Sequence, residues 1–347
     1  MSPDTFHGWV CSGKGAPLEW REMPLKTFDD DTVEMDITHC GICGSDLHTM
    51  DSGWGPTDYD VVVGHEITGV ATRIGKNVKH IKVGDRIGVG AQSGACLECD
   101  VCRNGDENLC LNGIIGTYNS RWPNGEKTFG GYADKWRGHQ RFVFKIPDNM
   151  SNEVAATFLC AGITTYSPLK RYNVKPGDKV GVIGIGGLGH FAIMWAKAMG
   201  AEVVALSSSD RKREDAKALG CDDYVVIGDE EAMKKHATSF THIICTSFSK
   251  DFNWIAYFSM MLPNSTFILV GLPEEPLKGI PPGLLALRQI SVVGSAIGSP
   301  KMIEEMLQLA SETSVRPWLN KFPMKECPQA VQHMREGKAR YRIILEN

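Results

Sequence analysis

The chain has 347 residues, of which 42% are hydrophobic and 22% charged, and its formal net charge is −4 at pH 7. This length favours two domains, and the acidic balance offers no basic surface for nucleic acid. No apolar run approaches the roughly 18 residues that span a bilayer, and the N-terminal segment does not look like a secretory signal, so we expect a cytoplasmic protein with no membrane partner.

The first half of the chain predicts a β-rich domain over residues 1–159. Short apolar or alternating runs, broken by glycine, proline and aspartate, indicate strands, and no long helix is evident. The strands are expected at 33–38, 66–74, 86–89 and 141–146.

After Cys160 apolar strands alternate with helical segments such as 211–219 and 252–261. This rhythm predicts an α/β fold with a doubly wound, parallel, six-stranded sheet over residues 160–298. Its strands are expected at 180–184, 203–207, 224–227, 242–246, 267–271 and 290–295. Residues 299–347, with a helix over 301–310 and a short segment at 341–345, could return to the first domain and make the sheet domain an insertion.

A glycine-rich turn follows the first of these strands. It has the spacing GxGxxG and precedes a helix expected over 191–199. Glycine at such a turn allows positive φ and lets a pyrophosphate approach the helix N-terminus. The turn therefore predicts a dinucleotide site, although a glycine-rich turn can also be purely structural. Its residues are Gly184, Ile185, Gly186, Gly187, Leu188 and Gly189.

Eleven cysteines in an intracellular chain indicate metal binding or thiol chemistry and not disulfides. Four of them have the spacing CxxCxxCx7C, which suits a closed tetrahedral zinc site of structural type. Unrelated thiols and an iron–sulfur cluster are the alternatives. The four are Cys96, Cys99, Cys102 and Cys110.

A second set of candidate ligands is spread along the chain. Cys43, His65 and Cys160 match the Cys2His set that leaves one position open on a catalytic zinc. Cys160 alone also fits an ordinary core residue. Cys40 and Cys43 form a CxxC that is redox-active in other folds, but no thioredoxin-like unit surrounds them, and we interpret Cys40 as a packing residue.

The ordered series GICGSDLH, VVGHEITG, the four-cysteine segment, LCAGITTYSPL and GIGGLGH resembles the zinc-dependent medium-chain alcohol dehydrogenases. It is most similar to the cinnamyl alcohol dehydrogenase branch and its NADP-dependent fungal relatives, from about residue 30 to the RYR sequence near the C-terminus. The resemblance implies a GroES-like catalytic domain (1–159) with a structural-zinc lobe at about 93–112, a Rossmann NADP-binding domain (160–298), and a homodimer formed through the nucleotide domains.

The resemblance also implies roles for single residues. Cys43, His65 and Cys160 would bind the catalytic zinc, and Glu66 would be a neighbouring or alternative ligand. Ser45 would occupy the hydroxyl position beside the reacting oxygen, and His48 would relay the proton of that oxygen to solvent. Taken alone, Ser45 would be interpreted as a turn hydroxyl and His48 as a surface histidine. Asp46 is expected to orient nearby groups without binding metal.

The second strand of the sheet ends without the acidic residue that binds the ribose hydroxyls in NAD enzymes. Ser207, Ser208 and Ser209 are followed within four residues by Lys212 and other cations, which suits the 2′-phosphate of NADP; the alternative is a solvated basic helix turn. Asp210 is the exception in this segment. The resemblance adds cofactor contacts at Ser45, Thr164, Thr246, Gly271, Ser295, Ala296 and Ile297.

The chemistry implied is reversible hydride transfer between a nicotinamide and a small alcohol or aldehyde, with two zinc ions per chain. Two places depart from the lignin-type enzymes, because residues 113–118 lack a tryptophan and Ala296 stands where phenylalanine is usual. Aromatic or medium-chain aldehydes are therefore expected as substrates. Reduction of a conjugated C=C or iminium bond, and a non-catalytic NADPH-binding protein, are the alternatives. The expected pocket comprises Trp54, Ile114, Ile115 and Ala296.

Overall fold

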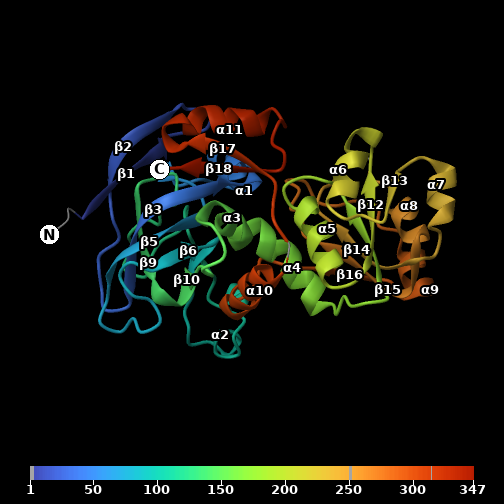
Figure 1. The fold of residues 1–347 in the computed structure, drawn as a ribbon, viewed down its shortest axis with the longest axis horizontal. Helices are drawn as coiled ribbons and strands as arrows, with labels where there is room; N and C mark the ends of the chain where they lie inside the picture. The colour runs from blue at the N-terminus through green and yellow to red at the C-terminus, as the bar shows by residue number, and fades with distance from the viewer. Residues whose placement is uncertain (1–3, 250–251, 314) are drawn as a thin grey trace. The chain divides into compact units, whose positions relative to one another are not determined.

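The computed structural model describes residues 4–249, 252–313 and 315–347 (Figure 1). The chain forms two compact units. The first unit combines the chain up to Ile163 with Ile297–Asn347, and the second unit is Thr164–Ala296. Among the described residues, no helix has both the length and the apolar character needed to cross a bilayer.

Two sheets form most of the first unit. The larger has the strand order β10-β6-β5-β3-β18-β17 with β9 paired to β3, and the smaller has the order β2-β1-β4. Their strands are β1 (Thr5–Cys11), β2 (Leu18–Pro24), β3 (Thr32–Ile42), β4 (Val61–Val62), β5 (Glu66–Ile74), β6 (Arg86–Val89), β9 (Lys135–His139), β10 (Phe144–Lys145), β17 (Leu319–Pro323) and β18 (Arg342–Glu346).

The C-terminal strand completes the sheet begun by the N-terminal strands. β18 pairs antiparallel with β3, and Leu345 lies opposite Cys40 (Figure 1). Both side chains are fully buried in one apolar core that also takes in Val33, Ile67 and Val89. Burial of these side chains fixes which face of each strand turns inward, because successive residues of a strand point to opposite faces.

The helical segments of the first unit are short, apart from one. A small ribbon of β7 (Gln92–Gly94) and β8 (Ile115–Gly116) flanks the segment that carries the four cysteines. The helices are α1 (Gly44–Met50), α2 (Asp100–Arg103), α3 (Asn152–Thr157), a π-helix (Phe158–Gly162), α10 (Pro300–Glu312) and α11 (Cys327–Arg335); α4 (Ile163–Arg171) begins at the end of this unit.

One predicted strand of this unit is wrong in its first half. The strand expected over 141–146 shortens to β10, because Gln140–Phe142 form a 3-10 turn in which the His139 side chain accepts the N–H of Arg141. Helix α1 was not predicted at all. Short polar helices of this kind carry little periodic signal.

The second unit is a parallel sheet with the order β13-β12-β11-β14-β15-β16, which is the doubly wound order 3-2-1-4-5-6. The predicted α/β fold class is confirmed. Its strands are β11 (Lys179–Ile183), β12 (Glu202–Ser207), β13 (Asp223–Val226), β14 (Phe240–Cys245), β15 (Met261–Leu269) and β16 (Ser291–Gly294).

Helices cover both faces of this sheet, and Figure 1 draws α5 on the side opposite α8 and α9. Trp254, Phe258 and Phe267 pack edge-on or tilted with ring centroids 5.3–5.5 Å apart, so an aromatic core lies under α8. The helices are α5 (Gly189–Ala198), α6 (Arg213–Ala218), α7 (Glu230–Lys235), α8 (Trp254–Ser259) and α9 (Pro282–Arg288).

Candidate active site

The first ligand stands where strand β3 turns into helix α1. Cys43 is the N-cap of α1, and its backbone N–H donates to Asp46 Oδ2 at 2.9 Å. The spacing of Ser45 and His48, three residues apart, places them on neighbouring positions of one face of α1. Ser45 Oγ lies 3.6 Å from Cys43 Sγ. The helix therefore carries a ligand and both expected relay residues.

Cys160 lies in the middle of the π-helix Phe158–Gly162, between α3 and α4. Such single-turn π segments are rare and are frequent at functional sites, because the extra residue redirects one side chain. The Cys160 Sγ lies 3.9 Å from Cys43 Sγ and 3.0 Å from His65 Nε2. Cys160 is thus not an isolated core residue.

These three side chains and Glu66 offer donor atoms that all lie within 4.8 Å of one another, and all four residues are buried. Two thiolates on one tetrahedral zinc are about 3.8 Å apart if each Zn–S bond is about 2.3 Å, close to the 3.9 Å between Cys43 and Cys160. Glu66 Oε2 is buried and has no hydrogen-bond partner among the residues that the structure describes. Two thiols, an imidazole and an unpaired carboxylate oxygen fit a zinc ion.

Asp46 fixes the orientation of His65. The Oδ1 of this fully buried carboxylate lies 3.1 Å from His65 Nδ1 and accepts the backbone N–H of Gly64, while Oδ2 accepts the hydroxyl of Tyr132 at 2.8 Å. The Tyr118 hydroxyl lies 2.9 Å from the same Nδ1. With Nδ1 engaged, Nε2 is the ring nitrogen that faces Cys160.

Glu66 is held by the C-terminal strand. Arg342 of β18, itself buried, donates to Glu66 Oε1 and to the carbonyl oxygen of Ile42. Burial raises the pKa of Glu66 to about 7, and the Arg342 charge opposes that rise. Arg342 is a site residue that the sequence analysis did not single out.

The thiols differ in their ionisation. The hydrogen bond with Cys160 holds the pKa of Cys43 well below its usual value even though burial opposes it. Burial raises the pKa of the Cys40 thiol well above its usual value. Cys40 therefore stays a neutral core side chain, in agreement with its interpretation as a packing residue, and Cys43 is ready to ionise for a metal.

The four-cysteine segment also comes together. Cys96 Sγ lies 3.9 Å from Cys102 Sγ and 3.4 Å from Cys110 Sγ, and Cys99 belongs to the same group of donor atoms within 4.8 Å. The backbone N–H groups of Glu98 and Cys99 lower the pKa of Cys96 to about 6. A group of four cysteine sulfurs fits a structural zinc.

In the second unit the glycine turn follows β11 at the switch point of the sheet. A Cβ on Gly189 would lie 1.8 Å from Gly184 O, whereas a Cβ on Gly186 would meet nothing within 4 Å. Thr246, which follows the adjacent strand β14, donates to Ile183 O at 2.8 Å. The third glycine is required for helix–strand contact, and the second borders the open space where a pyrophosphate would fit.

Ser207 ends β12 next to the start of the turn, because Leu206 lies opposite Ile183, and Ser208 and Ser209 follow it in the chain. Lys212 Nζ donates to the carbonyl oxygen of Ile185 in the glycine turn, so its charge lies next to the phosphate cradle. Asp210 pairs with Arg213 Nε at 2.6 Å. Asp210, the exception in the sequence, is thus paired with a cation three residues further along the chain.

The other expected cofactor contacts lie at or near the carboxyl ends of strands or at the edges of the units. Gly271 approaches the backbone of Thr246 so closely that a Cβ would lie 3.1 Å from it, and the Ser295 N–H donates to Leu269 O. Thr164 begins the second unit and Ala296 ends it, while Ile297 belongs to the first unit.

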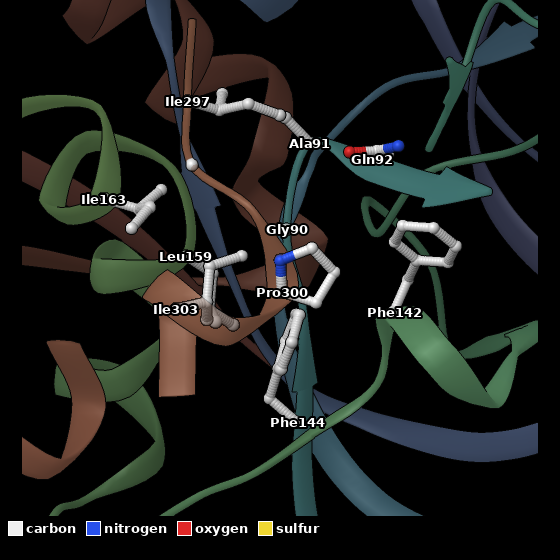
Figure 2. A pocket seen from close by; sticks show the side chains of 11 residues that line it. Gly90, Ala91, Gln92, Phe142, Phe144, Leu159, Ile163, Ile297, Pro300 and Ile303 are labelled. Carbon is white, nitrogen blue, oxygen red and sulfur yellow. The ribbon is translucent and has the colours of Figure 1, made fainter. Parts of the chain in front are cut away.

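A small apolar cavity lies in the first unit (Figure 2). Leu159 of its wall precedes Cys160, and Ala91 O accepts the N–H of Thr117, which precedes Tyr118. Gln92 contributes an amide to a wall that is otherwise mainly apolar. The lining is Gly90, Ala91, Gln92, Phe142, Phe144, Leu159, Ile163, Ile297, Gly298, Pro300 and Ile303.

The expected substrate pocket of Trp54, Ile114, Ile115 and Ala296 stays a prediction. Trp54 is 45% exposed and stacks on His48, with ring centroids 4.5 Å apart at 21°. Ile115 lies opposite Gly94 in the β7–β8 ribbon, and the neighbouring Ile114 is exposed. None of these side chains lines the cavity of Figure 2.

Comparison with known proteins identifies the family. Residues 29–148 match the alcohol dehydrogenase GroES-like domain and residues 187–312 the zinc-binding dehydrogenase domain. An NADP-dependent alcohol dehydrogenase of Mycolicibacterium smegmatis is 38% identical over 99% of this chain and 98% of its own. The chain belongs to the zinc-dependent medium-chain alcohol dehydrogenase family.

Solved structures place it in the branch of the cinnamyl alcohol dehydrogenases. The enzyme of Sorghum bicolor aligns with a TM-score of 0.94 at 34% identity, over 99% of this chain and 97% of that one. The enzyme of Helicobacter pylori in complex with NADP(H) gives 0.91 at 31%, over 99% and 98%. The resemblance in the sequence motifs is thereby confirmed, and with it an oxidoreductase that interconverts alcohols and aldehydes with zinc and a nicotinamide cofactor.

Proposed function

We propose that this alcohol dehydrogenase acts chiefly as an NADPH-dependent aldehyde reductase, reversible as an alcohol dehydrogenase, on aromatic or medium-chain substrates. The observation that carries the proposal is the buried group of Cys43, His65, Cys160 and an unpaired Glu66 oxygen next to a helix that bears Ser45 and His48. A zinc ion in that group would polarise the alcohol or carbonyl oxygen as a Lewis acid.

The side chains around the ligands have separate tasks. Asp46 keeps His65 in the tautomer that offers Nε2. Ser45 takes the proton of the reacting oxygen during oxidation and passes its own to His48, which exchanges with water; reduction runs the same path backward. Glu66, tied to Arg342, is a neighbouring carboxylate that can serve as an alternative ligand.

A screen of NADPH consumption over aldehydes tests this function. Benzaldehyde, cinnamaldehyde and straight-chain aldehydes should be turned over, and zinc should measure two per chain. With an α,β-unsaturated aldehyde the product should be the unsaturated alcohol; a saturated aldehyde would assign the chain to C=C reduction. No turnover of any carbonyl or conjugated bond, with NADPH bound, would leave a non-catalytic binding protein.

The choice of nicotinamide rests on Ser207, Ser208, Ser209 and Lys212. Replacing Lys212 by alanine removes a charged donor worth about 1.5–3 kcal/mol, so the preference for NADPH over NADH in kcat/KM should fall roughly 10- to 150-fold. The matched control is Lys217→Ala, on the exposed face of α6. Equal preference in the wild-type enzyme for both cofactors would contradict the phosphate site.

We also propose a homodimer in the cytoplasm. All eleven cysteines are free, which suits a reducing compartment. Strand β16 is an edge of the six-stranded sheet, and α9, which precedes it, presents Leu287 at 88% exposure. An edge strand beside an exposed leucine supports pairing with a second copy.

A further inference from the structure

The indole of Trp54, a residue that the sequence analysis expects in the substrate pocket, lies over the imidazole of His48. The two rings are stacked, with centroids 4.5 Å apart and planes inclined by 21°. His48 is half-buried in the last turn of α1, and Trp54 follows in the loop after that helix. The indole thus covers one face of the imidazole.

The loop that carries Trp54 is held against the end of α1 by several hydrogen bonds. The Gly53 N–H donates to His48 O at 2.7 Å, and Thr57 Oγ1 donates to Thr49 O at 2.5 Å. The Tyr59 hydroxyl donates to Met50 O and also contacts Ser52 Oγ. These bonds hold the loop on both sides of Trp54 against the end of α1.

Gly55 allows this path of the chain. Its φ is +139°, a conformation that side chains other than glycine rarely adopt, and a Cβ there would meet no atom within 4 Å. A substitution at Gly55 would consequently strain the backbone beside Trp54 without creating a clash.

We propose that Trp54 is a positioning residue for proton transfer. Its indole fixes the plane of the His48 ring for transfer from Ser45 and stabilises the imidazolium that forms during the transfer. The proposal rests on the function proposed above. In oxidation the proton leaves the reacting oxygen for Ser45, the Ser45 proton goes to one nitrogen of His48, and the proton on the other nitrogen goes to water. His48 is a cation between those two transfers, and the face of an indole attracts a cation.

One other feature of the structure favours the cation at the same place. His48 lies in the last turn of α1, where the carbonyl end of the helix carries partial negative charge. The indole adds control of the ring plane, which the helix end does not supply.

The test compares Trp54→Leu with Trp54→Phe in the zinc-loaded enzyme. Loss of the stack should lower kcat about three- to tenfold, the range set by exposed cation–π contacts and some loss of positioning. The phenylalanine variant, which retains an aromatic face, should recover most of the activity. The solvent deuterium isotope effect on kcat should increase in Trp54→Leu, because proton transfer limits the rate more.

Trp20→Leu is the matched control. Trp20 is 42% exposed and stacks on His7 with ring centroids 6.4 Å apart at 18°, but it lies in β2 and has no part in the relay. Its loss should leave kcat and the isotope effect unchanged. Gly55→Ala keeps the indole and should show the defect of Trp54→Leu in weaker form, which separates positioning from the mere presence of tryptophan.

Different results would overturn the proposal. If Trp54→Leu changes KM in step with the size of the aldehyde and leaves kcat and the isotope effect unchanged, Trp54 is a wall of the substrate pocket. If both variants at position 54 behave as wild type, the stack has no role. If Trp54→Leu does not fold, an unaltered isotope effect in Gly55→Ala overturns the proposal. An inactive wild-type enzyme would instead refute the proposed function.

Discussion

Asp46 is the residue on which the geometry of the ligand set depends most. Its two oxygens receive the N–H of Cys43, the N–H of Gly64 and the hydroxyl of Tyr132, and one of them also faces His65 Nδ1. An amide of the same size would turn an NH2 group toward at least one donor. Because a buried donor facing a donor is costly, the side chain would have to rotate or shift.

We therefore predict that Asp46→Asn weakens zinc binding at the Cys43 site by about 10- to 100-fold, the range for partners that orient a ligand histidine. Zinc retained after dialysis against graded chelator measures it. Tyr132→Phe removes a single donor to the carboxylate and should retain its zinc better. A variant Asp46→Asn with wild-type zinc content would show that the carboxylate is not what orients His65.

Ser45 provides a second prediction at this scale. Ser45→Ala should lower kcat by about two orders of magnitude, in the range of general acid–base groups. Zinc content should stay at two per chain, because the hydroxyl is not a ligand. Steady-state kinetics checks the expected fall in kcat, and metal analysis checks the retained zinc. Unchanged kinetics would remove Ser45 from the proton path.

Sequence reasoning found only part of this site, and the reason is physical. Cys43, His65 and Cys160 could be proposed because cysteine and histidine are the usual ligands of zinc and because the motifs around them resemble those of a known family. Tyr118 and Arg342 contact His65 and Glu66 across 53 and 276 residues of chain. The sequence around a tyrosine or an arginine does not predict a contact with a residue so far away in the chain.

At the scale of elements, the structure shows that two glycines of the GxGxxG turn are needed for different reasons, one for packing and one for cofactor access. Gly189 packs against Gly184 O, whereas Gly186 faces open space. We predict that Gly189→Ala destabilises the second unit even without cofactor, because a Cβ 1.8 Å from a carbonyl oxygen forces the helix off the strand. Gly186→Ala should leave the stability of the cofactor-free protein near wild type and weaken NADPH binding.

Thermal unfolding with and without NADPH distinguishes these two variants. The cofactor should raise the Tm of wild type strongly and that of Gly186→Ala only weakly, since ligand stabilisation follows the ratio of ligand concentration to Kd. If Gly186→Ala binds NADPH as tightly as wild type does, the pyrophosphate does not pass over this residue.

The elements that periodicity predicts well are the buried ones. The strands expected at 66–74 and 86–89 match β5 and β6 to the residue, because their apolar runs are bounded by glycine, aspartate or charged residues. Helix α1 and the π-helix escaped prediction. Neither element has the apolar stripe that periodicity detects. Helix α1 begins directly after the ligand Cys43, and the π-helix contains the ligand Cys160.

At the scale of the whole molecule, the chain leaves the first unit after Ile163 and returns to it at Ile297. The return is consequential for the site, because Arg342 of the last strand reaches Ile42 O across 300 residues. Sequence could indicate a strand near the C-terminus but not its partner, since a strand pairs by register with whichever edge is free. The metal site is therefore completed only when the last residues have folded.

Association of two copies is the prediction that concerns the molecule as a whole. Leu287 of α9, 88% exposed next to the edge strand β16, would be buried in a dimer formed through that edge. Burying a leucine contributes about 1.5–3 kcal/mol, so Leu287→Asp should raise the dimer dissociation constant by at least about 10- to 100-fold, and a buried carboxylate adds to that cost. Size-exclusion chromatography with light scattering over a dilution series measures the shift.

The matched control is Val83→Asp, because Val83 is also strongly exposed, at 61%, but belongs to the first unit. It should leave the dissociation constant unchanged. A wild-type protein that is monomeric at micromolar concentration contradicts the dimer, and a Leu287→Asp protein that dimerises like wild type moves the interface away from β16. Activity per chain in the dissociated variant then shows whether each copy carries a complete site, as the location of both zinc sites within a single chain leads us to expect.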